Sequence, residues 1–146
     1  MKPPRSLELA TVAAGAYTAA FLAGTVVSIR KGYIAEPLGL RTGNSVRRDV
    51  LRGNGAALAA PWNMIVQMWV AVAMARRPGR KGRKGRAWLA LLAASFLAGS
   101  VAEPVSHKVI RRELPVPERA IAIANVVIPG AILIGALVSL IDSEGG

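Results

Sequence analysis

The chain has 146 residues, of which 53% are hydrophobic and 18% charged, and its formal net charge is +11. Soluble domains contain roughly 25% charged residues, so this composition excludes an ordinary soluble domain. Long uncharged runs between the basic clusters are unlike a small nucleic-acid-binding domain, and no nucleic-acid partner is expected. The lack of cysteine and the single histidine, His107, exclude disulfides, iron–sulfur clusters and multi-histidine metal sites, so we expect neither a metal nor a cofactor.

Four long apolar runs predict an all-α, polytopic membrane protein. They cover residues 7–29, 56–75, 87–107 and 120–141, and charged residues flank them. Helices of this length, at a rise of ~1.5 Å per residue, cross a hydrocarbon core of ~30 Å. We therefore expect residues 1–146 to form a single four-span transmembrane domain that folds as a four-helix bundle.

Two of these runs share a short motif. Residues 21–26 (FLAGTV) match residues 96–101 (FLAGSV), and an Ala-Glu-Pro triplet follows each motif, at 35–37 and at 102–104. The distance from motif to triplet differs between the two copies. Two interpretations therefore remain open: a duplicated transmembrane hairpin whose first copy carries an insertion, or chance similarity in a chain rich in alanine, glycine and leucine.

The loops between the runs carry most of the charge. In the first loop, residues 45–52 (SVRRDVLR) predict a short helix that lies in the membrane interface against anionic headgroups, with a solvated basic loop as the alternative. Residues 76–86 contain seven basic residues and no acid, and they predict a flexible cationic connection. Pro115 and Pro117 are expected to keep the third loop extended.

The charges of these loops also bear on orientation. With four spans, both termini and the 76–86 loop share one side of the membrane, with nine Lys and Arg residues against ten on the other side. The positive-inside rule is therefore nearly balanced by number. The 76–86 loop is short and free of acids, whereas the other side carries five acidic residues. We therefore expect an integral protein of a bacterial cytoplasmic membrane, with cytoplasmic N- and C-termini.

Polar residues within the spans gather in the half of the bundle next to the first and third loops. Asn63 and Gln67 are four residues apart and share one face of the second span, as Glu103 and His107 do in the third. Asn125 lies about 8 Å inside the fourth span. Because unpaired polar groups are costly in hydrocarbon, we expect these side chains to line a cleft inside the bundle.

This cluster predicts acid–base chemistry on a hydrophobic small molecule that enters from the bilayer. Burial raises the pKa of a carboxylic acid, and a histidine one turn away can relay the proton, so Glu103 and His107 are the predicted catalytic residues. Isomerisation, cyclisation, hydration and cofactor-free oxidation all fit such a pair. Amides can hold a carbonyl or enolate oxygen, and the predicted substrate-binding residues are Glu36, Asn63, Gln67, Trp69, Arg111 and Asn125.

Other interpretations use the same residues. The amides can be hydrogen-bonding contacts between helices, and Glu103 can pair with Arg111 or Arg112 at headgroup level. A protonatable Glu103 also fits a proton-coupled transporter or a channel component. Contact surfaces would instead suit an accessory or assembly subunit of a membrane complex. A stripe of small residues on the first span indicates a helix-contact face, for the bundle or for a homodimer: Ala16, Ala20, Gly24 and Ser28.

Overall fold

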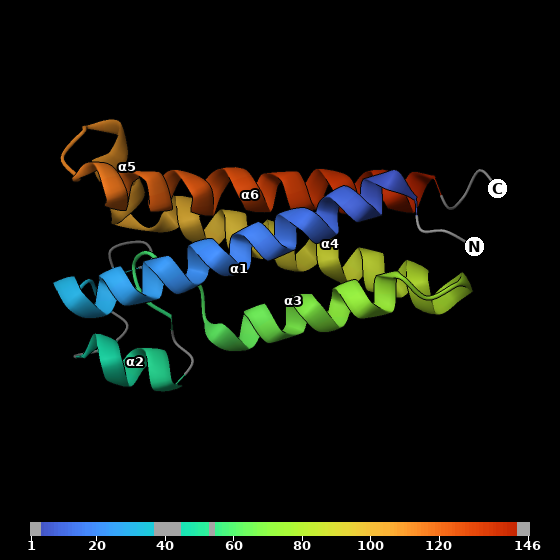
Figure 1. Cartoon of the computed structure of the whole chain (residues 1–146), viewed down its shortest axis with the longest axis horizontal. Coiled ribbons are helices and arrows are strands. Elements are labelled where there is room, and N and C mark those ends of the chain that lie inside the picture. The colour runs from blue at the N-terminus through green and yellow to red at the C-terminus, as the bar shows by residue number, and fades with distance from the viewer. Residues whose placement is uncertain (1–3, 37–44, 53–54, 143–146) are drawn as a thin grey trace.

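The computed structural model of the chain describes residues 4–36, 45–52 and 55–142. These residues form six helices and no strand, which confirms the all-α prediction (Figure 1). The helices are α1 (Arg5–Lys31), α2 (Val46–Arg52), α3 (Trp62–Ala75), α4 (Gly79–Ala102), α5 (Pro104–Ile110) and α6 (Val116–Ile141).

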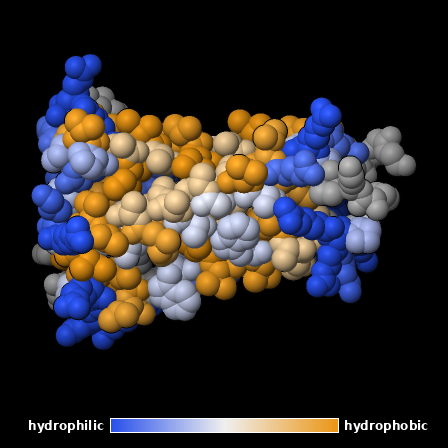
Figure 2. Space-filling view, in the orientation of Figure 1, coloured by the Kyte–Doolittle hydropathy of each residue, from blue (hydrophilic) through white to orange (hydrophobic). Residues whose placement is uncertain are grey.

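Three of these helices, α1, α4 and α6, are long and apolar enough to cross a membrane. They contain 27, 24 and 26 residues, so each exceeds the ~20 residues that a spanning helix needs. The helix α3 is also apolar, but with 14 residues it is shorter than a typical span. Charged side chains gather at the two ends of the molecule and an apolar band separates them (Figure 2). The protein is therefore an integral membrane protein.

The helices α1 and α4 run in one direction along the bundle, and α3 and α6 run in the opposite direction (Figure 1). The helix α6 contacts both α1 and α4, while α3 packs mainly against α4 (Figure 1). The start of α1, the end of α6 and the turn between α3 and α4 lie at one end of the bundle, which we call the terminal end. The helices α2 and α5 lie at the opposite end, which we call the α5 end. At the terminal end the Ser6 hydroxyl donates a hydrogen bond to Asp142, at 3.0 Å, and links α1 to the end of α6.

The turn between α3 and α4 is tight because glycines let the two helices approach each other. Gly79, the first residue of α4, has a φ of 64°, in the left-handed region that favours glycine. A Cβ atom at Gly82 would overlap the carbonyl of Arg77, and one at Gly85 would overlap the backbone of Ala75. Most of the basic 76–86 segment is thus folded into the first turns of α4, and the prediction of a flexible connection is wrong for that part.

At the α5 end the helices depart from the predicted spans in two places. The helix α3 begins at Trp62 rather than at residue 56. Residues 55–61 are not helical, and Pro61, which precedes the first helical residue, lacks the N–H that a helix interior requires. The helix α4 ends at Ala102, because Pro104 disfavours helical geometry at Glu103, whose φ and ψ are −73° and 133°. The predicted span over residues 87–107 is therefore interrupted, and α5 follows the break.

The helix α2 confirms the short helix predicted within residues 45–52. Val46 and Asp49 are buried on one side of it, whereas its three arginines are exposed. It contacts α1 near the α5 end. Its location in the membrane interface, against anionic headgroups, stays a prediction.

Candidate functional site

Residues 55–61 (GAALAAP) form a non-helical segment that inserts between the helices at the α5 end, and we call it the re-entrant segment. The N–H of Ala56 donates to the carbonyl of Ala59 at 2.8 Å, and the N–H of Ala59 donates back at 2.9 Å. These two bonds close a tight turn with Ala57 and the fully buried Leu58 at its tip. The N–H of Ala57 donates to the carbonyl of Tyr33 at 3.4 Å, so α1's own C-terminal extension supports the turn.

Side chains of α1 and α6 bond to both backbone groups of Leu58 at this tip. The N–H of Leu58 donates to the Ser28 hydroxyl at 3.4 Å, and the Asn125 amide donates to the Leu58 carbonyl at 2.8 Å. A Cβ atom at Gly24 would overlap this carbonyl, so glycine is needed for the close approach. Non-helical backbone at membrane depth is tolerated only where protein covers it, and these contacts meet that condition.

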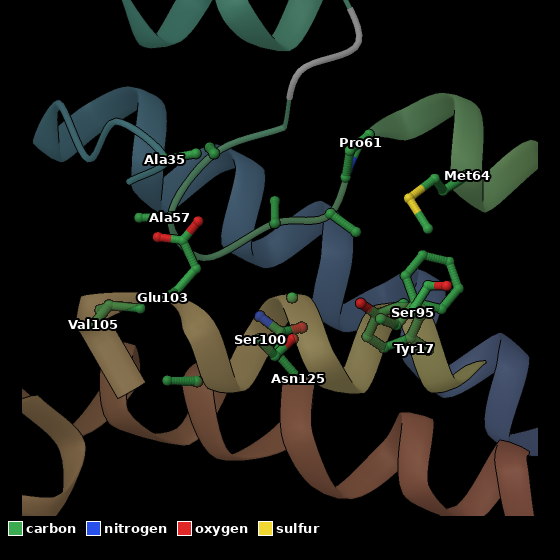
Figure 3. A pocket seen from close by; sticks show the side chains of 16 residues that line it. Tyr17, Ala35, Ala57, Pro61, Met64, Ser95, Ser100, Glu103, Val105 and Asn125 are labelled. Carbon is green, nitrogen blue, oxygen red and sulfur yellow. The ribbon is translucent and has the colours of Figure 1, made fainter. Parts of the chain in front are cut away.

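A cavity of about 250 Å³ lies beside the re-entrant segment, with walls from α1, α4 and α6 (Figure 3). Its surface is mainly apolar. Glu103 lies at one end of the cavity and Tyr17 at the other (Figure 3). The residues with polar side chains in its lining are Tyr17, Ser95, Ser100, Glu103 and Asn125. A mainly apolar cavity with a few converging polar groups is the usual form of a small-molecule site.

Glu103 supplies the carboxyl group of this cavity. It lies in the break between α4 and α5, and its Oε2 accepts a hydrogen bond from the N–H of Glu36 at 3.1 Å. Burial raises the pKa of Glu103 above its ordinary value of 4.5; the Glu36 N–H opposes this shift and the nearby Glu36 carboxylate adds to it. The two repeated triplets thus meet through the bond between Glu36 and Glu103, and Ala35 and Glu103 line the cavity. Pro37 of the first triplet lies outside the described residues.

Tyr17 lies at the opposite end of the cavity from Glu103. Its hydroxyl hydrogen-bonds with the side chain of Ser100 on α4. Its ring packs against Phe96 with the centroids 4.8 Å apart and the planes tilted by 52°, a favourable geometry for an aromatic pair. These contacts hold α1 and α4 together next to the cavity.

Asn125 has one satisfied and one unsatisfied group. Its amide nitrogen donates to the re-entrant segment, while its Oδ1 is buried and has no hydrogen-bond partner among the described residues. A buried acceptor without a partner costs about 1–3 kcal/mol. A donor group of a ligand that reached this oxygen would recover that free energy, so Asn125 combines a structural role with the capacity for binding.

The predicted catalytic pair does not share one cavity. Glu103 lines the cavity described above, whereas His107 is exposed on α5 and borders a separate apolar groove with Val101 and Ile123. The prediction assumed one continuous helix, on which residues four apart share a face. The break at Glu103 ends that periodicity, so the expected alignment of the two side chains is wrong.

The predicted amide cluster is also divided. Asn125 is buried at the cavity, but Asn63 and Gln67 are exposed on the outer face of α3. Their expected inward orientation is wrong, because α3 turns the face with Ile65 and Met68 toward the core.

The other predicted binding residues lie at the edge of the site or away from it. Glu36 contacts Glu103 through its backbone N–H. Trp69 is 40% exposed on α3, and its Nε1 donates to the Thr18 hydroxyl of α1 at 3.0 Å. Arg111 is exposed at the C-terminus of α5.

Sequence reasoning missed three of the polar cavity residues, Tyr17, Ser95 and Ser100. Single hydroxyl groups in apolar helices usually bond to their own helix, as Ser95 does with the carbonyl of Leu91 at 2.9 Å. Nothing in the sequence therefore distinguished them. Gly24 and Ser28 were predicted to contact another helix. Both contact the re-entrant segment, and a Cβ atom at Gly24 would also lie 3.3 Å from the side chain of Ile121 on α6.

Among the described residues, no three His, Asp or Glu side chains form a group that could hold a metal ion. Comparison of the chain with protein-family models, with curated proteins and with solved structures finds no match. The cavity is therefore interpreted from its own residues.

Proposed function

We propose that the cavity binds a small, mainly apolar molecule from the bilayer and that Glu103 transfers a proton to or from it. The observation that carries this proposal is the Glu103 carboxyl group in the lining of a mainly apolar cavity of about 250 Å³. Pockets for drug-sized ligands measure ~300–1,000 Å³, so the expected ligand is smaller. The re-entrant segment keeps one wall in place through its bonds to α1 and α6.

Isomerisation is the simplest reaction for these groups. The Glu103 carboxylate takes a proton from a carbon beside a carbonyl, the enolate oxygen accepts a hydrogen bond within the cavity, and the acid returns the proton to another carbon. Atoms and electrons balance without a second substrate or an oxidant. The raised pKa of Glu103 favours both steps, because it brings the carboxyl group closer to the pH at which it must accept and return the proton.

Dicyclohexylcarbodiimide, an apolar reagent, tests whether the cavity admits such molecules. It adds to a protonated carboxyl group, and the product rearranges to a stable N-acylurea that peptide mass spectrometry locates. In lipid nanodiscs we expect Glu103 to react faster than the exposed Glu113. Gly99 lines the cavity and a Cβ there meets open space, as it does at Gly130, which is not a lining residue. Gly99→Leu should slow labelling of Glu103, whereas the matched Gly130→Leu should not.

Deuterium incorporation tests the proton transfer itself. The protein is incubated in D₂O with an apolar extract of the membranes in which it is produced, and the extract is analysed by mass spectrometry. We expect one compound to gain deuterium at carbon with the wild-type chain and not with Glu103→Gln. If the carbodiimide labels Glu103 but no compound gains deuterium in a Glu103-dependent way, the cavity binds apolar molecules and the proposed proton transfer is wrong. Equal labelling of Glu103 and Glu113 would reject both.

A further inference from the structure

The outer face of α3 carries two amide side chains that no described residue of the protein satisfies. Asn63 and Gln67 are both exposed, and neither has a hydrogen-bond partner among the residues that the structure describes. The helix lies at the margin of the bundle, with α4 on one side (Figure 1). Its buried residues, such as Ile65, Met68 and Val72, all belong to the side that faces the core.

Both amides lie at hydrocarbon depth. Arg76 follows α3 directly and indicates the membrane surface at the terminal end. At ~1.5 Å per residue, Gln67 lies about 14 Å and Asn63 about 20 Å from Arg76, within a hydrocarbon core of ~30 Å. Each amide has two N–H donors and a carbonyl acceptor, none of which lipid tails can satisfy. The two side chains therefore need a protein partner.

The spacing on this face fits a helix as that partner. An exposed Val66 flanks the stripe, and Met74 at its end is partly exposed. Four residues form a stripe along this face, which we call the α3 seam: Asn63, Gln67, Val70 and Met74. They are separated by four, three and four residues, which is the spacing of contact residues in a coiled coil.

We infer that a second copy of the chain covers the α3 seam and forms a homodimer with its two-fold axis along the membrane normal. Two copies inserted in the same orientation place each seam residue opposite its counterpart. An amide is self-complementary across such an axis, because each copy donates an N–H to the carbonyl of the other. Asn63 of one copy pairs with Asn63 of the other, and Gln67 pairs with Gln67. Val70 adds an apolar contact between the two copies. This arrangement does not depend on the cavity or on Glu103.

Disulfide cross-linking in lipid vesicles tests the contact, because the chain has no cysteine of its own. A disulfide needs Cα atoms within about 7 Å of each other. We expect oxidation to convert Val70→Cys into a covalent dimer. The matched control is Leu91→Cys, which is exposed on α4 and lies at a similar depth: Leu91 is five residues from Arg86, and Val70 is six from Arg76. This control should stay monomeric.

Amide replacement tests the cause of the pairing. The double variant Asn63→Leu/Gln67→Leu removes two amide pairs and should weaken dimerisation about tenfold or more, measured by energy transfer between labelled copies as they are diluted in lipid. Asn63→Gln, which keeps an amide, should dimerise like the wild type. Cross-linking of Val70→Cys no faster than Leu91→Cys overturns the inference. So does unchanged dimerisation of the double variant, or a cross-linked product that contains a different protein.

Discussion

At the terminal end of the bundle, Gly85 brings the regular helices α3 and α4 into backbone contact, whereas at the α5 end Gly24 makes room for a non-helical segment. Regular helices satisfy their own backbone, so the first contact needs no polar side chain. The re-entrant segment exposes backbone groups that Ser28 and Asn125 must satisfy. The comparison shows why Ser28 and Asn125 are buried in this half of an apolar bundle: they support irregular backbone, and a cavity forms where that backbone meets the helices.

Replacing Gly24 should give the largest effect, because its Cβ would overlap the backbone of the re-entrant segment. We expect Gly24→Ala to lower the free energy of unfolding by about 3 kcal/mol, measured in mixed micelles. Gly15→Ala is the matched control on the same helix, where a Cβ meets nothing within 4 Å. It should raise stability by up to about 1 kcal/mol, because alanine favours the helix. Equal effects of the two variants would mean that residues 55–61 do not pack against α1.

Replacing Asn125 should give a smaller loss. Asn125→Ala leaves the Leu58 carbonyl without its 2.8 Å bond, and an unsatisfied buried group costs about 1–3 kcal/mol. Ser28→Ala removes a longer bond, at 3.4 Å, to the N–H of the same residue, and should cost less. Hydrogen exchange at residues 55–61 should accelerate in the same order. If Ser28→Ala proves the more harmful of the two, Asn125 is not the main support of the segment.

Glu103, at the α5 end, should make the free energy of unfolding depend on pH. An acid whose pKa is raised by folding stabilises the fold below its unfolded pKa and loses this contribution as the pH rises through its folded pKa. The free energy of unfolding should therefore fall as the pH rises above about 4.5. Thermal unfolding, followed by tryptophan fluorescence over a pH series, should show this fall in the wild type and a flatter profile in Glu103→Gln. The control is Glu113→Gln, an exposed substitution that keeps Glu103 in its cavity and should therefore retain the fall.

The membrane helices could be predicted from the sequence, but the re-entrant segment could not. Long apolar runs bounded by charges identify spans, and α1, α4 and α6 match three of the predicted four. Residues 55–61 are as apolar as their neighbours, so hydropathy does not distinguish a buried turn from the start of a helix. Gly55 and Pro61 were the local signs, but proline is also common at the first turn of a helix and glycine is frequent in membrane helices.

For the candidate site, the position of a residue along its helix could be predicted better than the direction of its side chain. Glu103 and Asn125 were expected in the same half of the bundle, and both line the cavity. Asn63 was expected to join them, but position along a helix does not decide which face a neighbour covers. Small residues around Ala71 and Ala75 let α4 pack on the opposite face of α3.

The smallest expected effect concerns the basic residues that begin α4 at the terminal end. Lys81 is exposed in the first turn of this helix, where the helix dipole disfavours a positive charge by about 0.3–1 kcal/mol. In zwitterionic lipid, Lys81→Gln should therefore raise the free energy of unfolding slightly. In anionic bilayers the sign should reverse, because a lysine near the surface gains about 1 kcal/mol from the negative headgroups.

Lys108 is the matched residue at the other end of the molecule. It is exposed in the last turn of α5, where the dipole favours a positive charge, so Lys108→Gln should lower stability in both lipids. Unfolding titrations of the two variants in both lipids provide the comparison. A sign change for Lys81→Gln alone would show that the first turns of α4 are stabilised by contact with anionic headgroups. The same sign in both lipids would show that the charge of this segment acts only through the helix itself.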